Sequence, residues 1–328
     1  MSDARSEPSF NVFDEIRAAC RAVAERARFV RIDRGRISEV AQLLALDGAP
    51  RPLYDRTHHF LGEEAATVSY VLALDTVNFG SGYFPHLRKR PGMSGYHTIA
   101  SALADRYRAV GPLDADSLAT ITPAACARLF GQEDFGEPID ELMDLVARAW
   151  NDLGRDLIDR FGGTCTGLVD AADRSAARLV ALLSAQPFFR DVARHDGRDV
   201  PLFKRAQIAA SDLALAFDGA GPGRFDDLDR LTIFADNLVP HVLRCDGVLH
   251  YDPKLLARID RGERIPAGSP EEVEIRACAV DAVERIAASL RATGTAVTAR
   301  DLDVLLWTRG QNPEYKRFPR HRTRTVFY

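Results

Sequence analysis

Cysteine pairs are missing from this 328-residue sequence, whose five cysteines stand far apart at positions 20, 126, 165, 245 and 278. No two form a CxxC pair and the number is odd, so neither a disulfide framework nor a zinc knuckle is indicated. No hydrophobic run approaches the ~18 residues that cross a membrane, and the N-terminal MSDARSEPSF has no apolar signal core. We therefore expect a protein of the reducing cytoplasm with no membrane contact.

An excess of positive charge is also lacking. The sequence has 43 Lys and Arg residues against 47 Asp and Glu residues, a net charge of −4. Proteins that grip nucleic acid usually present a basic face, so we expect no stable nucleic-acid binding, although this balance leaves room for a local basic patch. The hydrophobic fraction of 46% is enough, at this length, to bury a large core without disulfides or a structural metal.

The common motifs of phosphate, metal and hydrolase sites are absent: GxxxxGK[ST], GxGxxG opening a helix, HExxH, GxSxG and the EF-hand loop. The turn Gly80-Ser81-Gly82 is too short a signal for a phosphate loop. His58-His59, followed by Glu63-Glu64, offers metal-type ligands, but the spacing fits no known metal pattern. A surface cluster at the start of a helix explains these residues better, and we predict no metal site.

Helical periodicity dominates what is present, because apolar residues recur every three or four positions along most of the chain. Strand signals are confined to 28–32 and 324–328, so we expect a compact, mainly α bundle with at most a small accessory β element. No long linker divides it, which favours a single domain over 1–328, possibly as two helical lobes around a cleft. The expected helices span 12–30, 63–79, 97–107, 139–153, 175–183, 203–217, 228–243, 253–259, 271–290 and 301–308, with shorter helical pieces over 114–130.

Some helix ends carry clear signals. Ser269 precedes Pro270 and two acidic residues, a sequence typical of a helix N-terminus. Gly294 follows the same apolar periodicity and allows a left-handed stop.

Asp236 and Asn237 interrupt the apolar run from Leu231 to Leu243. If the run is one buried helix, an ionised carboxylate there is costly unless it is paired or faces a cleft. The other interpretation is a helix break, in which these residues cap a second helix that begins near Pro240. Both hold together if the capping geometry also points the carboxylate into a pocket.

Lys204 is one of only four lysines and enters an apolar helix with Gln207 on a neighbouring part of the same face. A lysine there either binds an anion such as phosphate or lies on the surface beside Arg205. The C-terminal segment 315–328 is rich in arginine and has no acidic residue. Such a segment binds a nucleic-acid strand or a phosphate in some proteins. Its alternating pattern favours a docked strand, with one arginine available to a ligand.

Taken in order, these segments resemble the queuosine salvage protein family, the queuosine 5′-phosphate N-glycosylases. The resemblance covers nearly the whole chain and depends on the combination of its pieces rather than on any one of them. These pieces are Ala73-Leu-Asp-Thr-Val-Asn-Phe79, Ser94-Gly-Tyr96, Arg160-Phe-Gly-Gly163, Phe203-Lys-Arg-Ala-Gln-Ile208, Leu231 to Leu243, Glu272-Val-Glu-Ile-Arg-Ala-Cys278, Leu305-Leu-Trp307 and Arg320 to Tyr328.

The resemblance implies an all-α fold akin to the helix-hairpin-helix DNA glycosylases, and no metal or organic cofactor. It implies hydrolysis of queuosine 5′-monophosphate to queuine and ribose 5-phosphate, with Asp236 as the catalytic carboxylate. Phe234 matches a base-contacting aromatic and Lys204 matches a lysine of the family's motif. The other candidate substrate-binding residues are Asn78, Tyr96, His97, Asn237, Trp307 and Arg309.

This sequence departs from eukaryotic relatives at two of these places. It has Asn237 where they tend to carry an aromatic residue, and Thr308-Arg309-Gly310 where they have acidic and aromatic residues after the tryptophan.

Two other functions remain open. One is a glycosylase that acts on a base within DNA or RNA, suggested by the implied fold. The other is a non-catalytic binder of a nucleotide or a modified tRNA through the basic C-terminus. The chemistry of the first hypothesis stands independently of the family: cleavage of a nucleoside passes through a ribosyl cation, which a carboxylate near C1′ stabilises.

Overall fold

The computed structural model describes residues 11–47, 52–134 and 136–328. They form a mainly α-helical molecule, as the sequence predicts, with two small antiparallel sheets of two strands each. The segment MSDARSEPSF lies outside the described residues, and a single domain over 1–328 stays a prediction. The helices among the described residues are all too short or too polar to cross a membrane.

Most elements along the chain are helices, and the strands are short. The elements are α1 (Val12–Ala24), β1 (Val30–Ile32), α2 (Arg34–Asp47), α3 (Glu64–Thr76), α4 (Gly95–Val110), α5 (Ala115–Thr120), α6 (Pro123–Phe130), α7 (Ile139–Arg160), α8 (Cys165–Ala171), α9 (Ala176–Ser184), β2 (Val192–His195), β3 (Arg198–Pro201), α10 (Lys204–Ala216), η1 (Gly221–Gly223), η2 (Leu228–Arg230), α11 (Val239–Cys245), β4 (Leu249–Tyr251), α12 (Pro253–Asp260), α13 (Pro270–Ala292), α14 (Ala299–Arg309) and α15 (Pro313–Lys316).

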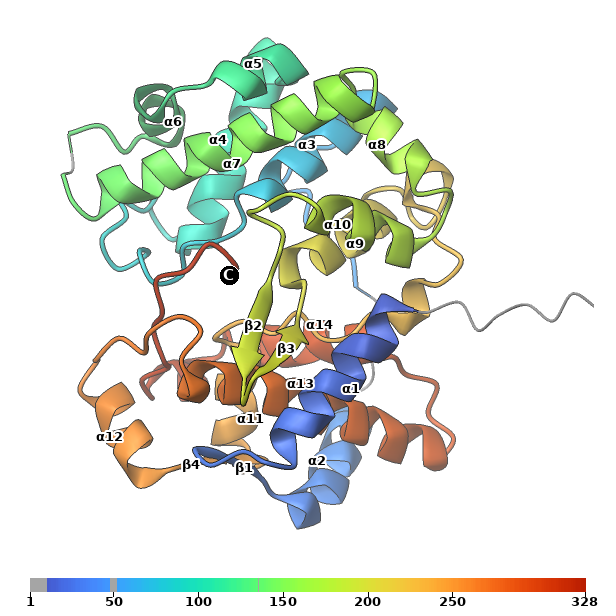
Figure 1. Ribbon diagram of the computed structural model, residues 1–328, viewed down its shortest axis with the longest axis vertical. Coiled ribbons are helices and arrows are strands. Elements are labelled where there is room, and N and C mark those ends of the chain that lie inside the picture. Colours follow the sequence, from blue (N-terminus) through green and yellow to red (C-terminus); the bar gives the residue numbers. More distant parts are fainter. Residues whose placement is uncertain (1–10, 48–51, 135) are drawn as a thin grey trace, which may run out of the picture.

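The helices gather in two groups (Figure 1). Helices α3 to α8 lie at one end, where α5 and α6 pack against α7. Helices α1, α2 and α11 to α13 lie at the other end, where α1 and α2 pack against α13. Between the groups lie α9, α10 and the β2–β3 hairpin, and α10 contacts α3. This arrangement brings residues far apart in sequence to the middle of the molecule.

Helix α13 lies at the centre of the second group and begins as predicted. The Ser269 hydroxyl accepts the backbone N–H of Glu272, and the helix ends before Gly294, whose φ of +88° is left-handed. Glu274, fully buried, accepts the backbone N–H groups of Arg28, Phe29 and Val30. One carboxylate thus fixes the entry of β1, which pairs with β4.

A buried ion pair joins α13 to the segment that precedes the β2–β3 hairpin. The guanidinium of Arg276 binds the carboxylate of Asp191 through two hydrogen bonds of 2.9 and 2.6 Å, and both residues are buried. Arg276 also donates to the carbonyl of Ala235, while the Asp191 carboxylate accepts the backbone N–H of Lys204. The pair therefore holds two chain segments that carry candidate site residues.

Three predictions of secondary structure are wrong. The helix expected over 12–30 ends at Ala24, and Val30 begins β1. The run 228–243 is not one helix: after the short η2 the chain is irregular over 231–238, and α11 begins only at Val239. The C-terminal residues 324–328 do not form a strand. Their backbone groups bond to loops instead of a neighbouring strand, and the Tyr328 carbonyl accepts the N–H of Gly80 at 3.1 Å. An isolated β-bridge pairs Arg322, just before these residues, with Arg264.

The C-terminal segment is nevertheless docked. Tyr328 is buried beneath the guanidinium of Arg276, which lies 4.7 Å from its ring centre. Gly82 accommodates the segment because a Cβ there would lie 2.3 Å from the carbonyl oxygen of Thr323. The C-terminal segment therefore packs against the Gly80–Gly82 turn.

We expect Arg276→Met to lower the free energy of unfolding by about 3–5 kcal/mol, because it leaves the buried Asp191 carboxylate without its partner. Urea denaturation measures this. The control is Arg194→Met, which removes an exposed ion pair with Asp199 and should cost less than about 1 kcal/mol. Equal effects of the two substitutions would contradict the structural role of Arg276.

Candidate active site

The irregular segment 231–238 carries Asp236 to the wall of a cavity. Its Oδ1 accepts the backbone N–H groups of Leu238 and Val239 at 2.7 and 3.1 Å, directly before Pro240 in the first turn of α11. The helix break therefore occurs, and the same side chain lines the cavity. The single buried helix is thus excluded, and the capping carboxylate also faces the cavity.

The cavity has a volume of about 990 Å³, within the range of small-molecule sites. Residues of the first helical group, of α10, of the 231–238 segment, of α14 and of the C-terminal segment line it together. The structure brings eight of the nine candidate residues to its wall: Asn78, Tyr96, His97, Lys204, Phe234, Asp236, Asn237 and Trp307.

Arg309 is the ninth candidate, and it does not line the cavity. Its guanidinium donates to the hydroxyl of Tyr315 and lies 3.5 Å from the carboxylate of Asp246. Asn237, in contrast, lines the cavity and donates to Ser81 Oγ at 3.2 Å. Asn237 thus ties the wall of the cavity to the Gly80–Gly82 turn.

Lys204 is buried, with 6% of its surface exposed, and therefore is not the surface residue of the alternative interpretation. It begins α10 directly after Phe203, whose φ of +44° is unusual for a bulky residue. Its ammonium makes no hydrogen bond or ion pair within the described ranges, and the side chain lines the cavity. Burial lowers the pKa of Lys204, and the negative charges of Asp236, Asp75 and Asp303 oppose this shift.

Three carboxylates of the site were not among the predicted residues. Asp303 on α14 and Asp212 on α10 line the cavity, and Asp75 on α3 lies behind it, bonded to Asn78. Burial, reinforced by the charge of Asp236, raises the pKa of Asp303 to about 7. Asp75 and Asp212 each interrupt an apolar helical run, the same signal that identified Asp236, whereas Asp303 follows Asp301 in a more polar segment.

Aromatic and histidine side chains form one rim of the cavity. The Tyr96 hydroxyl lies 2.8 Å from His59 Nε2, and the rings of His58 and His97 stack at 4.2 Å. The expected surface cluster of His58, His59, Glu63 and Glu64 does not describe His59, which is buried against Tyr96. Ligand atoms of Asp55, His58 and His97 lie within 4.8 Å of one another, and Asp55 already binds His58 at 2.7 Å.

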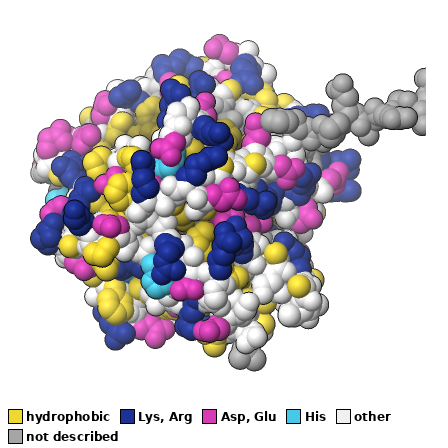
Figure 2. Space-filling model, turned by 60° about the horizontal axis from the view of Figure 1, so that its bottom comes forward, with side chains coloured by type: hydrophobic (Ala, Val, Ile, Leu, Met, Phe, Trp, Pro, Cys, Tyr) yellow, Lys and Arg dark blue, Asp and Glu magenta, His cyan; other side chains and the backbone are white. Residues whose placement is uncertain are grey.

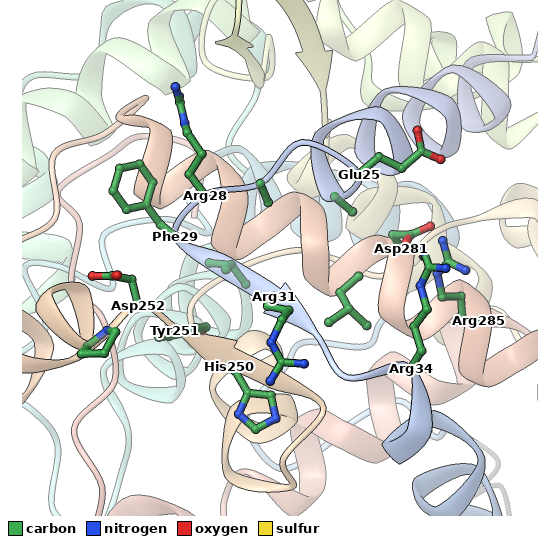
Figure 3. Close-up of a pocket in the computed structure, with 15 residues that line it drawn as sticks. Glu25, Arg28, Phe29, Arg31, Arg34, His250, Tyr251, Asp252, Asp281 and Arg285 are labelled. Atoms are coloured by element: carbon green, nitrogen blue, oxygen red, sulfur yellow. Dashed lines mark hydrogen bonds and ion pairs between the residues drawn. The ribbon is translucent and has the colours of Figure 1, made fainter.

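A second hollow, of about 520 Å³, lies along β1 and β4 (Figure 3). Arg34, Asp281 and Arg285 gather on one side of it and Asp252 lies on the other. Its charges largely neutralise one another: Arg285 binds Asp281 at 2.7 Å and Arg28 lies 3.3 Å from Asp196. None of the described residues that line it is a buried, unpaired ammonium like that of Lys204, so the first cavity is the candidate active site.

Known proteins are similar to this chain over most of its length. The family described as queuosine salvage protein matches residues 58–328. A protein of Sphaerobacter thermophilus named queuosine 5′-phosphate N-glycosylase/hydrolase is 42% identical over 313 residues, which cover 94% of this chain and 96% of that protein. Proteins with the same name from Dictyostelium discoideum and Bos taurus are 35% and 31% identical, covering 80% and 95% of this chain and 78% and 98% of their own lengths.

Asp303→Asn should change how stability depends on pH. Because the pKa of Asp303 is raised to about 7, the folded protein holds this proton more tightly than the unfolded chain does. The stabilisation is complete below about pH 4 and falls, by ~1.4 kcal/mol per pH unit, as the pH rises towards 7. Asparagine can still accept the backbone N–H of Phe234, which Asp303 binds at 2.8 Å, but does not titrate.

We therefore expect the variant to gain stability relative to the wild type between about pH 4.5 and pH 7, the window between the unfolded and folded pKa values. Urea denaturation at several pH values measures the difference. A difference that does not change with pH would show that Asp303 is ionised throughout.

Proposed function

The chain belongs to the queuosine salvage protein family, and from this premise we propose that it hydrolyses queuosine 5′-phosphate at the N-glycosidic bond. The products are queuine and ribose 5-phosphate. The observation that carries the proposal is the position of Asp236, held by two backbone N–H groups on the wall of a cavity that a buried lysine also lines. The family and its named relatives supply the substrate, and the cavity supplies groups suited to its chemistry.

The reaction leaves positive charge on the sugar. As the bond between C1′ and N9 breaks, its electron pair moves to the base and the ribose becomes a cation. Water then adds to C1′ and the base takes up a proton. Atom N7 of the purine is a carbon in queuine, so protonation there cannot help the base leave. This places more weight on the Asp236 carboxylate, which stabilises the cation or orients the water.

Lys204 and Asp303 set the charge around Asp236. The Lys204 ammonium lies near Asp236. Among the neighbouring charges, that of Asp236 raises the pKa of Lys204 most. Because its pKa is raised to about 7, Asp303 is only partly ionised near neutral pH, which reduces the negative charge next to Asp236. The Asp236 carboxylate is fixed before the substrate binds, because two backbone N–H groups hold it. The side chain is only partly buried and therefore remains accessible from the cavity.

Arg320 is the residue that we propose for the 5′-phosphate. It lines the cavity together with Lys316, Arg317 and Arg322, so that this wall is strongly basic. Desolvation within the cavity lowers the pKa of Arg320, and the charge of Asp236 partly offsets this effect. The Arg320 guanidinium is thus near the Asp236 carboxylate. A nucleotide that places C1′ at Asp236 would bring its 5′-phosphate within reach of Arg320.

Phe234 and Trp307 are the proposed contacts of the flat base. Both rings are on the cavity wall, and Trp307 meets His97 edge to face, with 6.3 Å between the ring centres. Stacking on aromatic rings is a common way to hold a base whose edges are also bound.

The small-molecule substrate suits the surface better than a nucleic acid does. Figure 2 shows basic and acidic side chains interspersed over the face that it draws. We therefore propose no stable nucleic-acid binding, and a cytoplasmic location in keeping with five free thiols. Salt-dependent retention of an oligonucleotide at micromolar concentration would instead favour a base glycosylase or a tRNA binder.

We expect Asp236→Asn to reduce turnover of queuosine 5′-phosphate by at least about 10³-fold, because the amide cannot balance the charge of the ribosyl cation. Free queuine is measured by mass spectrometry. Asparagine keeps an acceptor for Leu238 and Val239, so the fold should survive. The matched control is Asp252→Asn, since Asp252 caps α12 in the same way through the N–H groups of Lys254 and Leu255. A near-wild-type rate in the Asp236 variant would remove this residue from the mechanism.

Arg320→Gln should raise KM for queuosine 5′-phosphate by roughly 10- to 100-fold, the usual effect of losing a charged hydrogen bond. It should leave the hydrolysis of the unphosphorylated nucleoside little changed. The comparison variant is Arg309→Gln, which we expect to affect both substrates equally because the Arg309 guanidinium contacts Tyr315 and Asp246 and does not line the cavity. Loss of phosphate discrimination in the Arg309 variant instead would assign the phosphate to that residue.

A further inference from the structure

The substrate of the proposed reaction carries a second charge, at the end opposite its phosphate. In queuosine a methylene links position 7 of the base to a secondary amine, which bears the cyclopentenediol ring. Aliphatic amines of this kind are protonated at neutral pH. A site that selects this base over simpler 7-deazaguanines therefore has an ammonium group to recognise.

A pair of carboxylates at the cavity has no role in the chemistry described above. Asp212 of α10 lines the cavity, is partly buried and makes no hydrogen bond or ion pair with any described residue. Asp75 of α3 lies behind the cavity wall and is fully buried, and only its Oδ1 has a partner, the Asn78 amide at 3.2 Å. Its Oδ2 is buried without a partner. An unpaired buried acceptor is costly, so Asp75, next to the unpaired Asp212, provides a site for a donor.

The surroundings of the pair do not neutralise it. Burial raises the pKa of Asp212 to about 6, and the positive charges of Arg300 and Lys204 only oppose this shift. Arg300 already donates to Ser211 Oγ at 2.8 Å. Burial and the charge of Asp212 also raise the pKa of Asp75 well above its usual range, against Asn78, Lys204 and Arg205. Without a ligand, burial therefore favours the protonated form of these carboxyl groups.

The carboxylate pair and the basic wall face different parts of the cavity. Arg320 interacts with the charges of Asp236 and Arg322, whereas Asp212 interacts with Lys204 and Arg300. Tyr96 lies by the pair, since its pKa is raised by burial and then by the charges of Asp212 and Asp75. In the binding mode that we infer, the phosphate lies at Arg320, C1′ at Asp236 and the amine at Asp212, so that each charged end of the substrate meets a group of opposite sign.

We propose that Asp212, supported by Asp75, binds the protonated secondary amine of the substrate's 7-aminomethyl arm and so sets the preference for a base that carries it. This inference rests on the proposed function and extends it. The ammonium takes the place of the proton held by the two carboxylates, and that proton passes to solvent. The hydroxyl of Tyr96 and the ring of His59, 2.8 Å apart, lie next to this position and offer polar contacts to the diol.

Asp212→Asn tests the proposal with two substrates that differ only in the arm: queuosine 5′-phosphate and 7-deazaguanosine 5′-phosphate. We expect kcat/KM for the first to fall about 10- to 100-fold, as for a lost charged hydrogen bond, and kcat/KM for the second to change less than about threefold. The control is Asp144→Asn, which changes an exposed carboxylate in α7 and should alter neither value. Equal losses for both substrates, or no loss for either, would overturn the proposal.

Calorimetry separates this inference from the proposed function. Free queuine and 7-deazaguanine are titrated into the wild-type protein in two buffers of different ionisation enthalpy. We expect queuine to bind more tightly and to release more protons, and both differences to vanish in Asp212→Asn. If the wild type binds queuine in this way but hydrolyses neither nucleotide, the proposed function fails and the amine site stands. If queuine and 7-deazaguanine bind alike, the amine site fails whatever the rate of hydrolysis.

Discussion

The buried pair of Arg276 and Asp191 is the interaction on which the active site depends. Arg276 holds the carbonyl that precedes Asp236, and Asp191 holds the backbone N–H of Lys204. Two residues that line the cavity, though 32 positions apart in sequence, are thereby positioned by one ion pair between α13 and the residue before β2. Such a pair is stabilising only when its hydrogen-bonding groups are satisfied, and here bidentate geometry and backbone contacts satisfy them.

The cavity wall carries both basic and acidic side chains, and their positions matter more than their net charge. A basic C-terminal wall, the Asp236 carboxylate near the buried Lys204, and the Asp212 carboxylate all line the cavity. Burial raises the pKa of Asp303, Asp75 and Asp212 and lowers the pKa of Lys204, so each shift favours the uncharged form and reduces the cost of burial. The proposed substrate brings a negative and a positive end to this arrangement.

Much of the helical framework follows from the sequence because it is encoded locally. The Ser269-Pro270 start of α13 and the apolar stripe of α7 are examples. The hairpin β2–β3 escaped prediction although Asp196-Gly197, both with positive φ, is a turn sequence typical of hairpins. The break at Asp236 was only one of two interpretations, because a capping carboxylate and a buried helical one give the same pattern of residues.

The active site was predictable where a residue was unusual in its own segment and unpredictable where its role depends on distant neighbours. Lys204 and Asp236 are conspicuous in apolar surroundings. Asp303 gains its importance from a distant segment, because it binds the backbone N–H of Phe234. Arg309 contacts Tyr315 and Asp246, which are remote from each other in sequence, and its role towards a substrate stays a prediction. The left-handed backbone of Phe203 costs roughly 1–3 kcal/mol. Asp191 holds it in place: its backbone carbonyl accepts the N–H of Phe203, and its carboxylate accepts the N–H of Lys204. In a mutational scan for activity, positions 191 and 276 should therefore group with the residues that touch the substrate, although neither lines the cavity.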